Sequence, residues 1–198
     1  MENIENSLNK LSLNEFNMES YFDKLDKIIY DICSRKSKQV ITYDIFDTDK
    51  TKKYKLIVLK EKQKQMKIGE ILQVCIGNYE NFVNLKQGHE TGLDVISDDR
   101  KIIIEIKNRT NTDNASSKKS NLDKLAKFKK DNPKYICIYA CINDTTEEKT
   151  KKGAIKTIIH NGVEIKHMIG YKFLKFIFDE NVELIIDFIK KCIDKYMD

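Results

Sequence analysis

Apolar residues that recur every three or four positions predict several helices along the chain. In Tyr21–Ile32 and in Met66–Ile76 these residues fall on one side of a helix. Gly77-Asn78 ends the second segment in the manner of a C-cap. Asn121–Lys130 has a similar stripe and stops at Asp131-Asn132-Pro133. The same spacing predicts two closing helices, Tyr171–Phe178 and Val182–Tyr196.

The middle of the chain changes to the patterns of strands. Gly92–Ile96 and Ile102–Ile106 flank the polar turn Ser97–Arg100, which predicts a β-hairpin. Tyr135–Ile142 is a continuous apolar run of strand length, typical of a buried strand. A second hairpin is indicated by Asn161-Gly162, a strong turn signal between Ile155–His160 and Val163–Ile169.

The order of these elements favours an α/β (α+β) fold, in which a mixed central β-sheet is flanked by helices. At 198 residues the chain suits a single domain, 1–198, with residues 1–18 as a loose arm that is flexible or serves dimerisation. Val40–Phe46 has the composition of a strand and Asp47–Lys52 that of a turn, while Tyr54–Leu59 is compatible with either a strand or a helix. Asn108–Ser120 and Asn143–Gly153 are predicted to be polar loops.

Composition narrows the class of protein. No apolar run is long enough to cross a membrane, and the polar, acidic start lacks the order of a secretory signal, so we expect an intracellular protein. The five cysteines are scattered, mostly within apolar stretches, and are expected to be buried free thiols. The net charge is +5, and lysines gather in Lys52–Lys67 and Lys118–Lys130. Such stretches suit either phosphate binding or a solvated helix face.

Two acids and a lysine are predicted to meet at one end of the first hairpin. Glu105 and Lys107 are two residues apart on a strand, so their side chains point to the same face as Ile103. That face therefore begins apolar and ends charged. Pairing around the turn brings Asp94 opposite Ile104 or Glu105. Two carboxylates suit a hard divalent cation such as Mg²⁺, and a neighbouring lysine can act on water or stabilise a developing negative charge.

These residues resemble the PD-(D/E)XK nuclease signature. Asp94, ten intervening residues and then Glu105-Ile106-Lys107 match its core, with Leu93 in place of the proline that names the motif. The longer segment Glu105–Thr112 is similar to type II restriction endonucleases, including those that cut GGNCC-like sites. With the upstream Lys67-Ile68-Gly69-Glu70, the similarity extends to about His167 and covers half of the chain.

The resemblance implies a restriction-endonuclease-like fold and a sequence-specific double-stranded DNA endonuclease that leaves 5′-phosphates. It implies that Asp94, Glu105 and the backbone carbonyl of Ile106 bind Mg²⁺, with Mn²⁺ able to substitute. Lys107 would act on the attacking water, and Glu70 would be a further acid from the preceding helix, although a solvent-facing helix acid is equally compatible with its position. The family usually cuts palindromic sites as a homodimer and is paired genetically with a cognate DNA methyltransferase.

A run of short polar residues with one arginine follows the metal-binding strand. Such side chains are suited to phosphates and base edges, although a polar loop with Asx turns has the same composition. The DNA-binding candidates are Asn108, Arg109, Asn111, Thr112, Asn114, Ser117 and Lys118.

Three other functions are compatible with the sequence. The first is a repair, recombination or RNA nuclease of the same superfamily, which would lack a fixed palindromic cut. The second is a catalytically inactive nucleic-acid-binding module, although all three expected side chains are present. The third is a helix-rich structural protein in which Glu105 and Lys107 form a surface ion pair.

Overall fold

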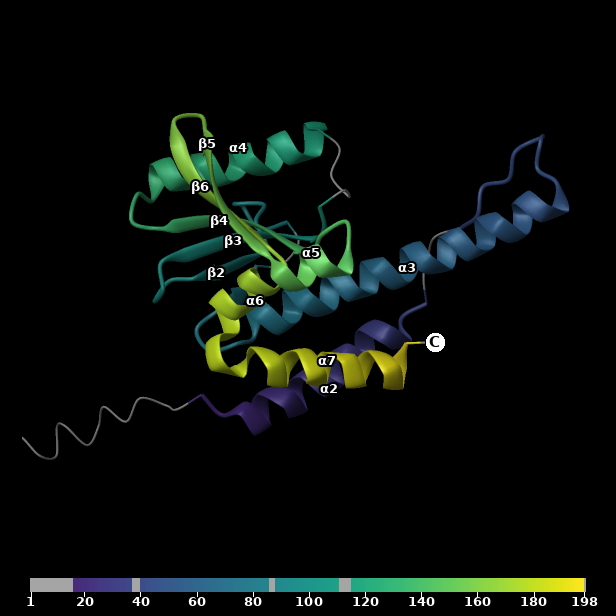
Figure 1. The fold of residues 1–198 in the computed structure, drawn as a ribbon, viewed down its shortest axis with the longest axis horizontal. Helices are drawn as coiled ribbons and strands as arrows, with labels where there is room; N and C mark the ends of the chain where they lie inside the picture. Colours follow the sequence, from purple (N-terminus) through teal and green to yellow (C-terminus); the bar gives the residue numbers. More distant parts are fainter. Residues whose placement is uncertain (1–15, 37–39, 86–87, 111–114, 198) are drawn as a thin grey trace, which may run out of the picture.

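A six-stranded mixed sheet forms the centre of the structure, a computed structural model that describes residues 16–36, 40–85, 88–110 and 115–197 (Figure 1). The strands are β1 (Val83–Asn84), β2 (Val95–Ser97), β3 (Ile102–Arg109), β4 (Ile136–Asn143), β5 (Ala154–His160) and β6 (Val163–Ile169). Their order across the sheet is β1-β2-β3-β4-β6-β5. The β3–β4 and β4–β6 pairs are parallel, and the β1–β2, β2–β3 and β5–β6 pairs are antiparallel.

Helices cover both faces of this sheet. They are α2 (Met18–Ser34), α3 (Asp49–Gly77), α4 (Ala115–Asp131), α5 (Glu147–Lys152), α6 (Tyr171–Phe178) and α7 (Val182–Tyr196), with the short 3-10 helix η1 (Asp179–Asn181) between the last two. Side chains of α2, α3, α6 and α7 share one apolar core with one face of the sheet, and α4 packs against the other (Figure 1). The α/β (α+β) class predicted from the sequence is therefore confirmed.

The central strand β3 divides its side chains between the two cores. Ile102, Ile104 and Ile106 pack toward α2, α3, α6 and α7, whereas Ile103 packs toward α4. Because strand side chains alternate, Glu105 belongs to the same face as Ile103, the face that α4 covers. Both faces of β3 are buried along most of its length, which explains its run of isoleucines.

The predicted hairpins and helix stripes are confirmed. The β5–β6 hairpin turns at Asn161 and Gly162, whose φ angles of 50° and 78° suit a type I′ turn. The helix α2 begins at the N-cap Asn17, which accepts a hydrogen bond from the Ser20 amide at 2.9 Å. All five cysteines are free and buried, as expected. None of the helices in the described ranges is long and apolar enough to cross a membrane.

The segment before α3 differs from the prediction. Val40–Phe46 was expected to be a strand, but the structure gives it no strand partner and bends it through a turn at Ile45-Phe46. β-branched composition alone does not make a strand, because a strand needs a neighbour for its backbone hydrogen bonds. The turn expected over Asp47–Lys52 is also shorter than predicted, since α3 begins at Asp49 and continues through Tyr54–Leu59.

Two predicted loops contain regular structure. Asn108 and Arg109 still belong to β3, and α4 begins at Ala115, so Ser117 and Lys118 lie on a helix rather than in a loop. Asn143–Gly153 contains α5, whose N-cap Thr146 accepts from the Lys149 amide at 3.2 Å. Of the arm predicted over residues 1–18, residues 1–15 lie outside the described residues, and Phe16 packs against Tyr21 and Tyr79.

Candidate active site

The β2–β3 hairpin brings Asp94 beside Glu105. Val95 pairs with Ile104, and the Asp94 amide donates to the Ile104 carbonyl at 3.1 Å. Asp94 directly precedes β2, and continuation of this antiparallel register would place it opposite Glu105, one of the two partners that pairing around the turn left open. Opposed residues in such a ladder share a face, so the two carboxylates lie on the side of the sheet that carries Lys107.

The Asp94 carboxylate is held at both of its oxygens. Oδ2 accepts from the Ile106 backbone amide at 2.7 Å, and Oδ1 accepts from the Gln73 side-chain amide at 3.2 Å. The same Gln73 nitrogen lies 3.2 Å from Oδ1 of Asn84. In an extended strand, the N–H and the C=O of one residue point to the same side. Because the Ile106 N–H points toward Asp94, the Ile106 carbonyl oxygen also points to that side of β3. Three oxygen-bearing groups therefore converge at the strand end.

Glu105 and Lys107 form a largely buried ion pair. The Lys107 Nζ lies 2.8 Å from Glu105 Oε1, and the Glu105 side chain is only 5% exposed. Burial, followed by the charge of Asp94, raises the pKa of Glu105, and Lys107 partly offsets this. Burial likewise raises the pKa of Asp94. Two carboxylates that are desolvated and repel each other form a site that a cation would stabilise.

This donor set fits a magnesium ion. Mg²⁺ is bound in proteins by one or two carboxylates and keeps several waters, so Asp94, Glu105 and the Ile106 carbonyl supply enough oxygen ligands. Within the described ranges, no group of three or more His, Cys, Asp or Glu side chains is arranged to hold a metal. The two carboxylates and the backbone carbonyl are oxygen donors, the type that a hard cation prefers.

The sequence of the whole chain identifies the family to which this site belongs. The sequence model of the Eco47II restriction endonuclease matches residues 1–197. The chain belongs to this family of restriction endonucleases. No curated protein and no solved structure matches it. Membership of the Eco47II family makes the chain a nuclease with DNA as its substrate, and its mixed sheet flanked by helices is consistent with a restriction-endonuclease-like fold.

Glu70, the further acid that the motif suggested in this restriction endonuclease, lies in the same hollow as Asp94. That hollow is lined by residues of α3, the β1–β2 region and α4. Glu70 Oε1 lies 2.8 Å from a guanidinium nitrogen of Arg35, at the end of α2. The structure therefore gives Glu70 a charged partner other than a metal, while keeping it on the wall of the site.

Two residues of the site were not selected from the sequence. Gln73 holds Asp94, and it lies three residues after Glu70, which puts both on one side of α3. Lys124 of α4 donates to the Gly92 carbonyl at 3.1 Å, and its charge lowers the pKa of both Asp94 and Glu105. Only the helical spacing from Glu70 gave a local signal for Gln73. Lys124 gave none, because it reaches the site through tertiary packing.

The DNA-binding candidates of the restriction endonuclease divide into three groups. Ser117 lines a second, polar hollow together with Lys107. The Lys118 ammonium lies 6.0 Å from the ring centroid of Tyr139, and Tyr139 is the residue of β4 that pairs with Glu105. Arg109 and Asn108 lie at the end of β3 and contact α3: Arg109 is 3.7 Å from Glu61, and the Asn108 amide donates to the Gln65 carbonyl at 2.9 Å. The remaining candidates, Asn111, Thr112 and Asn114, lie outside the described residues.

Proposed function

We propose that this member of the Eco47II family is a type II enzyme that cuts both strands of double-stranded DNA at a specific sequence. It depends on Mg²⁺, for which Mn²⁺ substitutes, and leaves 5′-phosphate ends. The supporting observation is the meeting of Asp94, Glu105 and Lys107 at one edge of the β2–β3 hairpin, with both carboxylates desolvated. This arrangement argues against a surface ion pair of only structural use, because the Glu105 side chain is 5% exposed.

Asp94, Glu105 and the carbonyl of Ile106 would hold the metal. When bound, Mg²⁺ supplies Lewis acidity toward the phosphodiester and toward bound water. Lys107 contributes a positive charge 2.8 Å from Glu105, where it donates hydrogen bonds to the attacking water or to a phosphate oxygen. The Asp94 carboxylate stays correctly oriented because the Ile106 amide and Gln73 hold it at both oxygens.

The surrounding residues position this centre and the DNA. Lys124 adds positive charge beside both carboxylates, and Glu70, held by Arg35, lines the same hollow as Asp94. Ser117 and Lys118 of α4 present donors on the Lys107 side, where the backbone of the bound strand would lie. Arg109 lies at the end of the strand that carries Lys107 and is assigned to a phosphate, with Asn108 beside it and Asn111, Thr112 and Asn114 following in the chain.

The assembly that performs the reaction is proposed to be a homodimer of single-domain chains. A two-fold axis would place one active site on each strand of a palindrome. A cognate DNA methyltransferase would protect the host sequence.

Digestion of a plasmid of known sequence, followed by mapping of the fragment ends, tests this function. We expect cuts at one palindromic sequence, with 5′-phosphate ends, in Mg²⁺ or Mn²⁺ and none in EDTA.

Lys107→Ala should lower cleavage by about 10²–10⁴-fold while retaining DNA binding, because it removes one catalytic group. Glu164→Gln, which alters a Glu–Lys pair on the exposed face of β6, is the control and should cut normally. Random nicking, RNA cleavage only, or full activity of Lys107→Ala would refute the proposal.

A further inference from the structure

The first two-thirds of α3 project from the body of the protein as a basic arm, defined here as residues 49–67. Figure 1 shows α3 extending well past the sheet and past α2 and α7. The first buried residue of the helix is Ile71, so no side chain of the arm enters the core. Eight lysines and two acids lie in the arm, which gives it a charge of +6, whereas the whole chain carries only +5. The arm is therefore the more basic of two lysine-rich helical segments, since α4 carries six lysines and two acids.

The arm leaves the body next to the catalytic strand. At its base, the Gln65 carbonyl accepts from the Asn108 amide at 2.9 Å, and Glu61 lies 3.7 Å from Arg109. Asn108 and Arg109 directly follow Lys107 in β3. A duplex whose scissile phosphate lies at Lys107 would therefore run close to the base of the arm.

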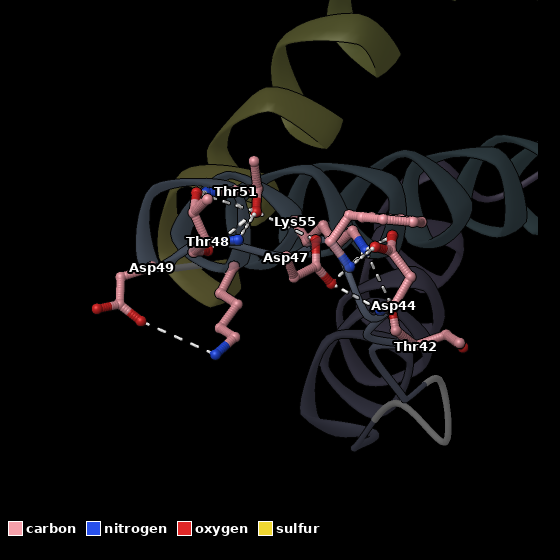
Figure 2. Close-up of polar contacts among 9 residues, drawn as sticks. Thr42, Asp44, Asp47, Thr48, Asp49, Thr51 and Lys55 are labelled. Carbon is pink, nitrogen blue, oxygen red and sulfur yellow. Dashed lines mark hydrogen bonds and ion pairs between the residues drawn. The ribbon is translucent and has the colours of Figure 1, made fainter.

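The tip of the arm is held by polar contacts, as Figure 2 shows. Lys55 Nζ contacts carboxylate oxygens of Asp47 and Asp44 at 2.6 and 3.0 Å, and Thr48 and Thr51 form a capping box at the helix start. Lys55 is thus neutralised by two acids of the segment that precedes the arm. Lys52 has only a long, 3.8 Å ion pair with Asp49. For Lys53, Lys62 and Lys64, all exposed, the described residues provide no ion pair.

The lysines of the arm face in two directions. Gln73 marks the side of α3 that faces the active site, because its side chain contacts Asp94. At 3.6 residues per turn, Lys62 and Lys52 lie within about 60° of that side. Lys53 and Lys64 lie about 160–180° away from it. The helix therefore offers two pairs of exposed lysines with the same charge and opposite directions.

We propose that Lys52 and Lys62 bind backbone phosphates of the DNA that flanks the cleavage site. With a rise of 1.5 Å per residue, Lys62 lies about 16 Å and Lys52 about 31 Å along the helix from Gln73, which corresponds to about 5 and 9 base pairs of duplex. The inference rests on the proposed function, since it takes the scissile phosphate to lie at Lys107. It adds a contact surface outside the base pairs that are read and cut.

A second copy of the chain is the competing occupant of this surface. The arm and the segment before it expose apolar side chains, among them Ile45 at 91%, Phe46 at 88% and Ile57 at 65%. Two arms that met would, however, bring two charges of +6 together. The phosphate backbone complements that charge, and the counterions it releases would strengthen binding. Charge complementarity therefore favours DNA.

Two double variants of the full-length protein test this inference. Lys52→Gln/Lys62→Gln removes the site-facing pair, and Lys53→Gln/Lys64→Gln removes the opposite pair as the matched control. Binding to a mixed-sequence duplex of about 40 base pairs is measured by fluorescence anisotropy in EDTA, from about 50 to 300 mM salt, so that no strand is cut. The site-facing variant should bind about tenfold more weakly at low salt and lose about 1.8 from the slope of log affinity against log salt. The control should match the wild type.

Duplexes that contain the mapped cleavage site add a second readout. With flanks of about 12 base pairs the site-facing variant should bind more weakly than the wild type, and with flanks of about 3 base pairs the two should bind equally.

Equal salt slopes for the wild type and the site-facing variant would overturn the inference, as would equal losses in both double variants. Dissociation of a dimer by Phe46→Ser/Ile57→Ser, with DNA binding of the lysine variants unchanged, would identify the arm as an interface between copies instead. Failure of the proposed function is a separate result, namely no metal-dependent cleavage by the wild type.

Discussion

Replacing Glu105 with glutamine should stabilise the metal-free protein while it abolishes cleavage. The Glu105 side chain is 5% exposed and shares its face with Asp94, and both burial and the Asp94 charge raise its pKa. The charged form is therefore less favourable in the folded protein than in the unfolded chain. Glutamine has the same shape, has no charge to desolvate, and keeps an oxygen that accepts from Lys107.

The sign and size of the effect follow from proton linkage. Because the pKa of Glu105 is higher in the folded state, the stability of the wild type falls as the pH rises from the unfolded pKa through the folded one. Above both, the charge of Glu105 opposes folding by a constant amount. We expect Glu105→Gln to gain about 0.5–2 kcal/mol at pH 8, the range of single stabilising substitutions. In a chain of this size, each kcal/mol raises Tm by about 2–4 °C.

Urea unfolding in EDTA between pH 4 and pH 8 measures this gain. At pH 4 the variant and the wild type should be equally stable, because Glu105 is protonated in the wild type. Glu164→Gln is the matched control, since Glu164 and Lys166 have the same spacing on a strand but are exposed, and Lys166 lowers the pKa of Glu164. The control should show no gain at pH 8. A loss of stability in Glu105→Gln at every pH would show that the charge of Glu105 favours the fold and would refute the reasoning.

Two further predictions concern the support of the site and of the fold. Gln73→Leu should weaken Mn²⁺ affinity or cleavage by about 10–100-fold through loss of its hydrogen bond to Asp94, and unchanged metal titration would remove Gln73 from the site. Gly170→Ala should cost about 3 kcal/mol or more in urea unfolding, because a Cβ there would lie 2.1 Å from the Thr150 carbonyl oxygen at a φ of +60°. Gly162→Ala, at a φ of +78° with open space around it, should cost only about 1 kcal/mol, and equal losses in the two variants would contradict the close approach.

Local patterns were sufficient to predict the part of the fold that holds the acids. The alternation along β3 predicted which residues share a face with Glu105, and the length of the turn placed Asp94 opposite Ile104 or Glu105. Gln73 and Lys124 could not be selected in this way. They lie 21 and 30 residues from Asp94 in the sequence and reach it only through helix packing against the sheet. Glu70 was identified by its motif, but no local pattern indicates its ion pair with Arg35.

The predictions failed where the sequence lacks a hydrophobic period. The apolar residues of the α3 arm are mostly consecutive, Leu56–Leu59, and so form no stripe along one side of the helix. Its capping box uses Thr48 and Thr51 rather than a glutamate. Val40–Phe46 has the composition of a strand but no partner to pair with. The apparent loop before Asn121 is the first part of α4, where serines and lysines replace the apolar residues that usually mark a helix.

A manganese titration followed by electron paramagnetic resonance tests most directly whether Asp94 and Glu105 form a divalent cation site. The wild type should bind Mn²⁺, and Mg²⁺ should compete with it. Asp94→Asn and Glu105→Gln should each lose that binding, since each removes one of the two carboxylate ligands. The same bound stoichiometry and affinity in the wild type and in both variants would show that the metal binds elsewhere and would contradict the account.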